Sequence, residues 1–344
     1  MQKSIIYYND QELKEDEVNI SHVTLNTGYK IWIDLINPTS SELTNLQQIF
    51  SIDKDAIKKI ESNSKKQQIL ILDDQKFTIL LQLKYRNLKN LETLPRYFFV
   101  GKGWLITIHS ESIDLLSQGR KMFLKNNKIL EYSIDALYYS IITSIIDSYE
   151  ILVTAIEIKL LDFEKDAQYK PSKTTLTHLD LLSKQSIMIR RYFWHARNII
   201  NYLKNTEQDK EDIKYLNVVY DDINQLIDMV ESYRDTINST REIFSSSISL
   251  QLNETMRVLT IFSTIILPLS LLIGIFSMEG FNLNNLTLIP RHFGILVLVM
   301  VSMIGTSLFL LWKKNWILSK DMKLNNEDEF DKDHHQDIQN KKRR

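Results

Sequence analysis

Two long apolar segments lie near the C-terminal end of a chain that is otherwise rich in charged positions. Residues 258–278 contain 21 consecutive uncharged side chains, and residues 293–312 contain 20. At about 1.5 Å per residue, the first segment forms a helix of roughly 31 Å, which matches the hydrocarbon thickness of a bilayer. Buried helices of soluble proteins are usually shorter or carry polar positions, so the pattern predicts two membrane-spanning helices. The connecting loop, residues 279–292, is short and predicts an antiparallel hairpin.

The first part of the chain shows the short apolar runs of a mixed α/β domain. Residues 30–35 alternate like a strand, and the residues after Pro38 predict a helix over 41–50, with Thr39 or Ser40 as its N-cap. The predicted strands are residues 30–35, 68–72, 77–83, 96–100 and 104–109. A Gly-Lys-Gly sequence between the last two predicts a hairpin. We therefore expect an α/β domain over residues 1–125.

After this domain the apolar pattern becomes helical. Three long helices are predicted, over residues 132–166, 174–203 and 209–278. The third carries apolar residues at alternating spacings of three and four, a seam typical of helices that pack at a shallow angle. The seam consists of Leu216, Val219, Ile223, Leu226, Val230, Tyr233 and Ile237. A helix of this length implies packing against the other two helices and against copies of the chain. Residues 126–257 are thus expected to form a helical stalk and hairpin.

Composition and motifs exclude several classes of protein. The net charge of −1 does not suggest a nucleic-acid binder, and the absence of cysteine excludes disulfides and Cys-ligated zinc. The sequence has no Walker A loop, no G-x-G-x-x-G and no H-E-x-x-H. The polar N-terminal residues argue against a signal peptide. We expect no enzyme activity, no catalytic residue and no cofactor.

The distribution of basic residues predicts the orientation of the two spans. The loop over residues 279–292 has one basic residue, Arg291, whereas the second span is followed by Lys313, Lys314, Lys320 and Lys323, and the chain ends in KKRR. Positive residues favour the cytoplasmic side. We therefore expect a multi-pass protein of the cell (inner) membrane with both termini cytoplasmic. The loop would be external, and residues 313–344 would form a cytoplasmic basic end and a disordered tail.

One face of the first span carries small and hydroxylated residues. Starting from Asn253, helical steps of three and four residues define a stripe on an otherwise large and apolar helix. Its members are Asn253, Met256, Thr260, Ser263, Leu267, Ser270, Gly274 and Ser277. A narrow polar stripe suits a helix that lines a water-filled path. Close packing of membrane helices through small residues would also explain the stripe, so both interpretations stay open at this point.

The first span carries a distinctive set of residues: Asn253-Glu254-Thr255-Met256 and the residues that follow, and the Pro268 to Gly274 spacing. The second span ends on Trp312-Lys313-Lys314. In these residues the chain closely resembles the pore region of the CorA family of magnesium transporters. Further matches are Trp32-Ile33-Asp34-Leu35 near the N-terminus and residues 104–109. The resemblance extends over nearly the whole chain.

This resemblance implies a funnel-shaped homopentamer in which five copies of the long helix line a pore. The substrate would be a divalent metal cation, most simply Mg²⁺, with Co²⁺, Ni²⁺ and Zn²⁺ as alternatives. By matching position, the pore-lining residues would be Asn253, Met256, Leu259, Thr260, Ser263, Leu267, Ser270, Gly274 and Ser277. Apart from metal ions, the expected partners are other copies of the chain and the lipid bilayer, and no nucleic acid.

The chain departs from the family at the outer end of this helix. The family signature there is Gly-Met-Asn, whereas an alignment without gaps gives Ser277-Met278-Glu279 in this chain. A second alignment places Gly280-Phe281-Asn282 at the signature, and either set would select ions at the mouth. A ring of Glu279 carboxylates would concentrate cations and hold a partly dehydrated metal, whereas Mg²⁺ dehydrates reluctantly. Zinc, nickel and cobalt therefore stay open as substrates.

A second departure concerns regulation by intracellular metal. In the family, acidic residues between subunits bind the cation and close the channel. The matching position in the stalk is Val218, and Asp221 or Asp222 would have to act in its place. Two other functions also remain: a non-conducting membrane scaffold or regulator derived from the family, and a proton-coupled zinc transporter.

Overall fold

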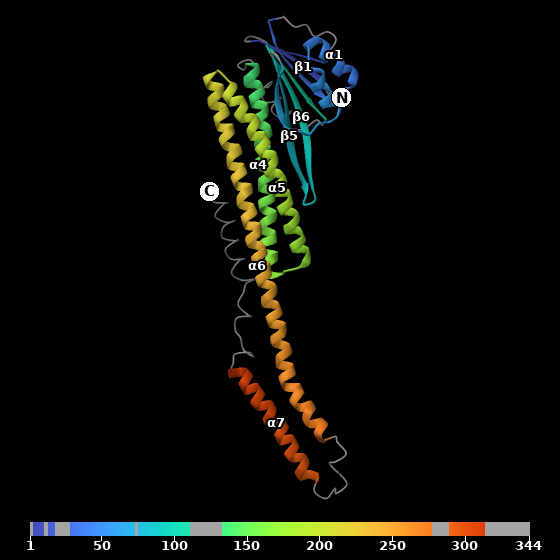
Figure 1. Cartoon of the computed structure of the whole chain (residues 1–344), viewed down its shortest axis with the longest axis vertical. Helices are drawn as coiled ribbons and strands as arrows, with labels where there is room; N and C mark the ends of the chain where they lie inside the picture. The colour runs from blue at the N-terminus through green and yellow to red at the C-terminus, as the bar shows by residue number, and fades with distance from the viewer. Residues whose placement is uncertain are drawn as a thin grey trace. The chain divides into compact units, whose positions relative to one another are not determined.

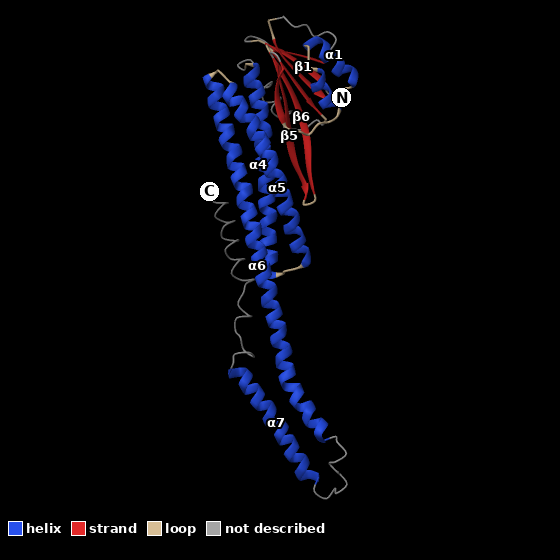
Figure 2. Cartoon of the chain, viewed as in Figure 1, coloured by secondary structure: helices blue, strands red, loops and turns tan. Residues whose placement is uncertain are grey.

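The computed structural model describes residues 3–9, 13–17, 28–72, 75–110, 133–276 and 289–313. These residues divide into two compact units, Met1–Ser247 and Ile248–Arg344, and the boundary falls within one long helix. The predicted domain boundary near residue 125 lies outside the described residues. Figures 1 and 2 show the elements of both units.

The first unit contains a seven-stranded mixed sheet with the order β2-β1-β3-β7-β6-β5-β4. All neighbouring strands are antiparallel except β3 and β7, which are parallel. The strands are β1 (Lys3–Tyr8), β2 (Leu13–Glu17), β3 (Lys30–Ile36), β4 (Gln68–Leu72), β5 (Gln75–Asn87), β6 (Asn90–Gly101) and β7 (Trp104–His109). The five predicted strands are confirmed, and the hairpin between β6 and β7 turns at Gly103, whose φ of +83° favours glycine.

Two short helices cover one face of this sheet. Helix α1 (Ser40–Phe50) begins at Thr39, whose hydroxyl accepts from the Glu42 backbone N–H while the Glu42 carboxylate accepts from the Thr39 N–H. This reciprocal capping fixes the start of the helix that was predicted here. Helix α2 (Lys54–Glu61), which the sequence pattern missed, is capped by Asp53. Both helices pack on alternate residues of the strands, such as Ile33 and Ile106.

Three long helices complete the first unit. Helix α4 (Ile134–Tyr169) lies against the other face of the sheet, where Trp32, Phe98 and Tyr138 share its core. Helix α5 (Lys173–Thr206) runs beside α4 and ends at its C-cap residue, Glu207. Helix α6 (Lys210–Phe276) begins three residues later. Every residue of the predicted α6 seam is buried in this core. The prediction that the seam packs against the other two helices is therefore confirmed.

In the described residues, the second unit consists of the remainder of α6 and of helix α7 (Ile289–Lys313). By length and apolar composition, α6 is the one described helix suited to cross a membrane, and the apolar window that qualifies is not buried. The described apolar part of α7, Val297–Lys313, is shorter. The two predicted spans thus coincide with helical segments of this unit.

Candidate functional site

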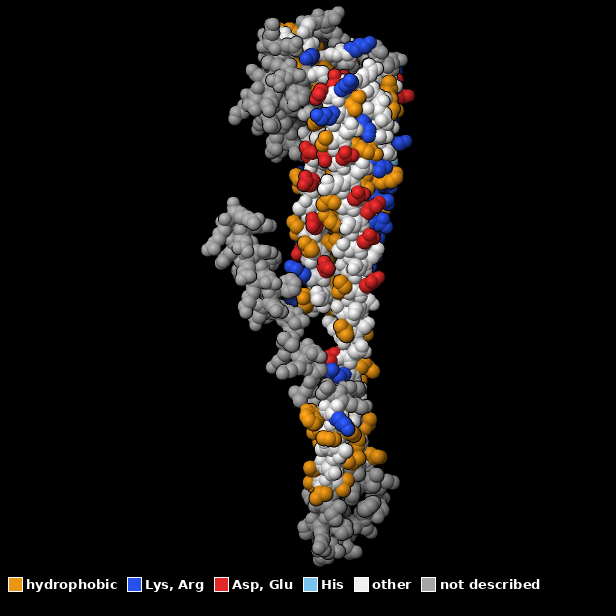
Figure 3. Space-filling view, turned by 90° about the vertical axis from the view of Figure 1, so that its left-hand side faces the viewer, with side chains coloured by type: hydrophobic (Ala, Val, Ile, Leu, Met, Phe, Trp, Pro, Cys, Tyr) orange, Lys and Arg blue, Asp and Glu red, His pale blue; other side chains and the backbone are white. Residues whose placement is uncertain are grey.

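The apolar part of α6 has two distinct faces. Glu254, Arg257, Ile261, Ile265 and Pro268 are half-buried and recur at steps of three and four, so they share one side of the helix. Large apolar residues elsewhere remain open: Leu267 is 67% exposed and Leu271 is 66% exposed. Figure 3 shows such hydrophobic side chains on the surface of the second unit. A surface of this kind needs lipid or another protein chain to cover it.

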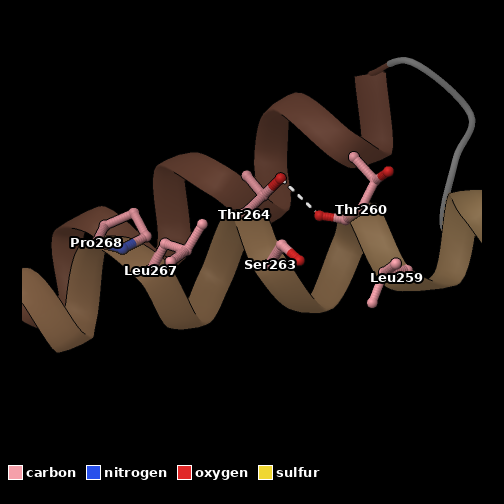
Figure 4. A pocket seen from close by; sticks show the side chains of 6 residues that line it. All are labelled: Leu259, Thr260, Ser263, Thr264, Leu267 and Pro268. Carbon is pink, nitrogen blue, oxygen red and sulfur yellow. Dashed lines mark hydrogen bonds between the residues drawn. The ribbon is translucent and has the colours of Figure 1, made fainter.

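Helix α7 accounts for the half-buried side of α6. Its own less exposed residues, Met300, Ile304, Ser307 and Leu311, also recur at steps of four and three. The two helices lie side by side in the second unit (Figures 1 and 4). We infer that these two faces pack against each other.

The predicted pore stripe lies on the opposite side of α6. Helical geometry places Ser263, Leu267 and Ser270 about half a turn away from the face that α7 covers. Of the described stripe residues, Ser263 is half-buried between its larger neighbours and the others are exposed: Asn253, Met256, Leu259, Thr260, Leu267, Ser270 and Gly274. Packing against α7 within one chain therefore does not explain why these residues are small.

A shallow groove of about 400 Å³ runs from this stripe to Pro268, at the edge of the half-buried side. It is lined by Leu259, Thr260, Ser263, Thr264, Leu267 and Pro268, which Figure 4 shows from close by. The groove alternates hydroxyl groups with leucine side chains. It carries no ionised group, because residues 258–276 contain none.

The hydroxyl groups of the groove expose oxygen lone pairs. The Thr260 hydroxyl donates to the Met256 carbonyl at 2.7 Å, and the Thr264 hydroxyl donates to the Thr260 carbonyl at 2.7 Å. Their hydrogens are thus used within the helix, and each oxygen keeps acceptor capacity. A cation with its water shell presents hydrogens outward, so such oxygens are suited to it.

Pro268 adds a further acceptor. Proline has no backbone N–H, so the carbonyl of Thr264, four residues earlier, lacks its normal helical donor. Thr264 and Pro268 both line the groove. The sequence stripe did not include Thr264, although a threonine four residues before a helical proline is a signal that would have found it.

Charged side chains stand only at the beginning of the apolar segment of α6. Arg257 lies 3.3 Å from the Glu254 carboxylate, one turn earlier. The other end of the helix reaches Phe276. The predicted selectivity residues Ser277, Met278, Glu279, Gly280, Phe281 and Asn282 lie outside the described residues and stay predictions.

The acidic residues proposed for regulation lie in the first unit. Asp221 and Asp222 are exposed on α6. Asp222 is close enough to Asp147 of α4 to affect it: burial raises the pKa of Asp147, and the charges of Asp222 and Glu150 raise it further. Within the described residues, no three His, Asp or Glu side chains converge as metal ligands usually do. A metal site at Asp221 and Asp222 stays a prediction.

The whole sequence is similar to known proteins. The sequence model of the family described as "CorA-like Mg2+ transporter protein" matches residues 28–313. The chain is 24% identical over 324 residues to the "Cobalt/magnesium transport protein CorA" of Thermotoga maritima, covering 91% of this chain and 92% of that one. It is also 24% identical over 315 residues to the protein of the same name from Methanocaldococcus jannaschii, covering 89% and 96%.

Solved structures share the fold. "The complete structure of CorA magnesium transporter from Methanocaldococcus jannaschii" matches with a TM-score of 0.75 at 21% identity, over 92% of this chain and 99% of that one. The full-length CmaX protein matches with a TM-score of 0.69 at 16% identity, over 92% and 98%. The cytoplasmic domain of ZntB from Vibrio parahaemolyticus matches with a TM-score of 0.59 at 14% identity, over 72% and 99%.

Proposed function

We propose, from the premise that this chain belongs to the CorA-like Mg²⁺ transporter family, that it carries divalent metal cations across the cell (inner) membrane. Members of this family are ion transporters, so we assign neither a catalytic residue nor a cofactor. Relatives named for cobalt and magnesium transport make Mg²⁺ and Co²⁺ the first substrates to test.

The observation that carries the proposal is the acceptor-rich groove on the exposed side of α6. Oxygen atoms of Thr260, Ser263 and Thr264 face outward from a helix that has no ionised side chain after Arg257. A neutral groove of acceptors binds the water shell of a cation without holding the metal itself. Met256, Leu259 and Leu267 stand between the polar positions as apolar rings that resist wetting when the path is narrow.

One groove does not enclose a pathway, so several copies must surround a common axis. We propose the homopentamer that the family resemblance implies, with α6 of each copy at the centre. A membrane potential of about 100 mV, negative inside, would drive a divalent cation inward with about 4.6 kcal/mol. Both termini would then be cytoplasmic, in keeping with the basic residues after α7.

Flux measurements on the purified protein in proteoliposomes test this function. We expect Mg²⁺ or Co²⁺ uptake that starts when a potassium diffusion potential is imposed and needs no proton gradient. Parallel assays with Ni²⁺ and Zn²⁺ define the preference. Zinc uptake that stops when the proton gradient is collapsed would establish the proton-coupled alternative. Absence of flux for all four ions would establish the non-conducting scaffold.

Replacement of Glu279 tests which residue forms the outer ring. If five Glu279 carboxylates surround the mouth, Glu279→Asn should shift preference from Zn²⁺, Ni²⁺ or Co²⁺ toward Mg²⁺, because a neutral ring binds the hydrated ion through dipoles. Asn282→Asp is the matched variant for the alternative alignment. A shift with this second change alone would assign the ring to Asn282.

A further inference from the structure

The helices of the first unit differ sharply in charge. Helix α4 has seven acidic residues against two lysines, a net charge of −5. Helix α5 has six lysines and arginines against one aspartate, a net charge of +5. Figure 3 shows that on one side of this unit acidic side chains cover the middle of the surface and basic ones gather along its right-hand edge.

Part of the basic charge of α5 serves the fold of the single chain. Arg190 pairs with Glu231 of α6 at 2.5 Å, and Arg241 of α6 pairs with Asp180 of α5 at 2.7 Å. Arg197 donates to Asn224 of α6. These contacts hold α5 against α6.

An exposed stripe of α5 adjoins these contacts: Asp180 lies one turn before Lys184 on the same side, and the Arg197 guanidinium lies 4.2 Å from the centre of the Trp194 ring. Lys184, Ile187, Arg191, Trp194 and Tyr202 recur at helical spacing and are exposed; we call them the α5 face. Trp194 is 44% exposed and Ile187 is 52% exposed. Within the described part of the chain, neither Lys184 nor Arg191 forms an ion pair. Tryptophan, tyrosine and arginine on one surface are typical of protein–protein contacts.

Helix α4 presents a complementary surface. Asp147, Glu150, Ile151, Ile158 and Leu161 share one exposed side, which we call the α4 face. Ile151 is 68% exposed and Ile158 is 55% exposed. Asp147 and Glu150 likewise have no ion-pair partner among the described residues, and their mutual repulsion with Asp222 is unrelieved. A positively charged side chain facing this surface would offset that repulsion.

We propose that the α5 face of one copy docks on the α4 face of the next copy. Contact between two α5 faces would bring Lys184 and Arg191 of both copies together, and their positive charges would repel. Contact between two α4 faces would likewise bring together the negative charges of Asp147 and Glu150. Contact of the α5 face with the α4 face places basic side chains opposite acidic ones and aromatic side chains opposite aliphatic ones. Such a contact joins different surfaces of identical chains, so it builds a ring when the rotation between neighbours closes, and it does not build a two-fold dimer.

This proposal goes beyond ion transport and is tested by neighbour contacts, so it can fail while the proposed function stands. The chain has no cysteine, and single cysteines can therefore be introduced without background. Chains carrying Ile187→Cys and chains carrying Ile158→Cys are co-expressed at full length, purified in detergent and treated with a short bis-maleimide. We expect crosslinked dimers from the mixture and none from either variant alone. Crosslinking of one variant with itself, or none in the mixture, overturns the proposal.

Charge reversal provides the second test. We expect the double variant Lys184→Glu with Arg191→Glu to raise, at least tenfold, the protein concentration at which half of the assembly dissociates into single chains. We expect the same of Asp147→Lys with Glu150→Lys. All four changes in one chain should restore assembly to within about threefold of the parent, which also shows that the single-face variants are not merely unfolded. Lys65→Glu with Lys66→Glu, on an exposed loop, is the control of equal charge change and should have no effect.

The rival occupant of the α4 face is a divalent metal cation. If EDTA abolishes the crosslink between position 187 and position 158, a metal bridges the copies and the direct contact is refuted. Failure of the four-residue exchange to restore assembly equally refutes it, because the two faces then do not bind each other.

Discussion

Helix α6 passes through two regions that use the same helical spacing in opposite ways. In the first unit, apolar residues at steps of three and four, from Leu216 to Ile237, are buried in the core. In the second unit, mostly small and polar residues hold the corresponding spacing, and large apolar residues such as Phe262 and Leu271 are exposed. The first pattern is satisfied within one chain. The second is not, and we propose that lipid covers its apolar sides and other copies of the chain meet along the stripe.

The difference also separates stability from transport. Burial of the seam contributes folding free energy in a single copy, because each apolar side chain leaves water. The groove around Ser263 buries little in one copy, so its residues are expected to contribute little to folding. Substitutions in the two regions should therefore change different measured quantities.

The largest effect is expected from filling the groove. Ser263→Phe places a large apolar ring where we propose that the hydrated cation passes. We expect cation flux in proteoliposomes to fall by about tenfold or more, equivalent to at least about 1.4 kcal/mol in the barrier. Ser302→Phe, at an exposed position of α7, is the matched control and should keep its flux. Equal flux in both variants would remove the stripe from the ion path.

Truncation of the buried seam should produce the largest loss of stability. Ile223 is fully buried, and Ile223→Ala should lower the free energy of unfolding by about 2–5 kcal/mol, as large-to-small core substitutions do. Ile273→Ala makes the same chemical change at a residue that is 56% exposed, and should cost less than about 1 kcal/mol. Thermal unfolding in detergent measures both. Similar losses would mean that the second region is buried as deeply as the first.

Sequence patterns predicted the regions where local spacing decides the structure. The α6 seam, the capped start of α1 and the hairpin at Gly103 all follow from residues close together in the chain. Strand β2, whose sequence is LKEDE, carries no alternating apolar pattern, and its backbone pairs with β1. No local sequence pattern predicts such a strand.

The candidate site was predictable to a similar extent. Helical spacing placed the stripe on one face of α6, but the spacing does not tell which face α7 covers, since that depends on contacts between segments far apart in sequence. The freed carbonyl of Thr264 depends only on Pro268 four residues later and was readable from the chain. The residues of the outer mouth stay a prediction.

A smaller effect should follow from restoring the missing helical hydrogen bond in the groove. Pro268→Ala supplies an N–H for the Thr264 carbonyl and removes that acceptor from the groove. Loss of one acceptor worth about 1 kcal/mol corresponds to about a fivefold decrease in flux. The same change should raise the thermal stability, because proline is unfavourable inside a helix. Leu269→Ala, on the next residue, is the control, and a parallel decrease in its flux would show that the carbonyl is not involved.

The smallest effect concerns pH and belongs to the first unit alone. Tyr139 donates to the Glu207 carboxylate. Burial opposes ionisation of Glu207, but the Tyr139 hydroxyl and the backbone N–H groups of Asp209 and Gln208 outweigh it, so the pKa of Glu207 is lowered. An acid with a lowered pKa stabilises the fold above its unfolded-state pKa, and this contribution is lost as the pH falls through the folded-state pKa.

Tyr139→Phe should therefore cost about 1 kcal/mol of unfolding free energy near neutral pH, and the difference from the parent should close as the pH falls below about 4. Tyr169→Phe, at an exposed tyrosine of the same helix, should show no such difference at either pH. Residues 258–276 have no titrating side chain, so this part of α6 adds no pH dependence of its own. A deficit for Tyr139→Phe that persists unchanged in acid would assign the role of Tyr139 to packing, because loss of a bond to a carboxylate must fade when that carboxylate is protonated.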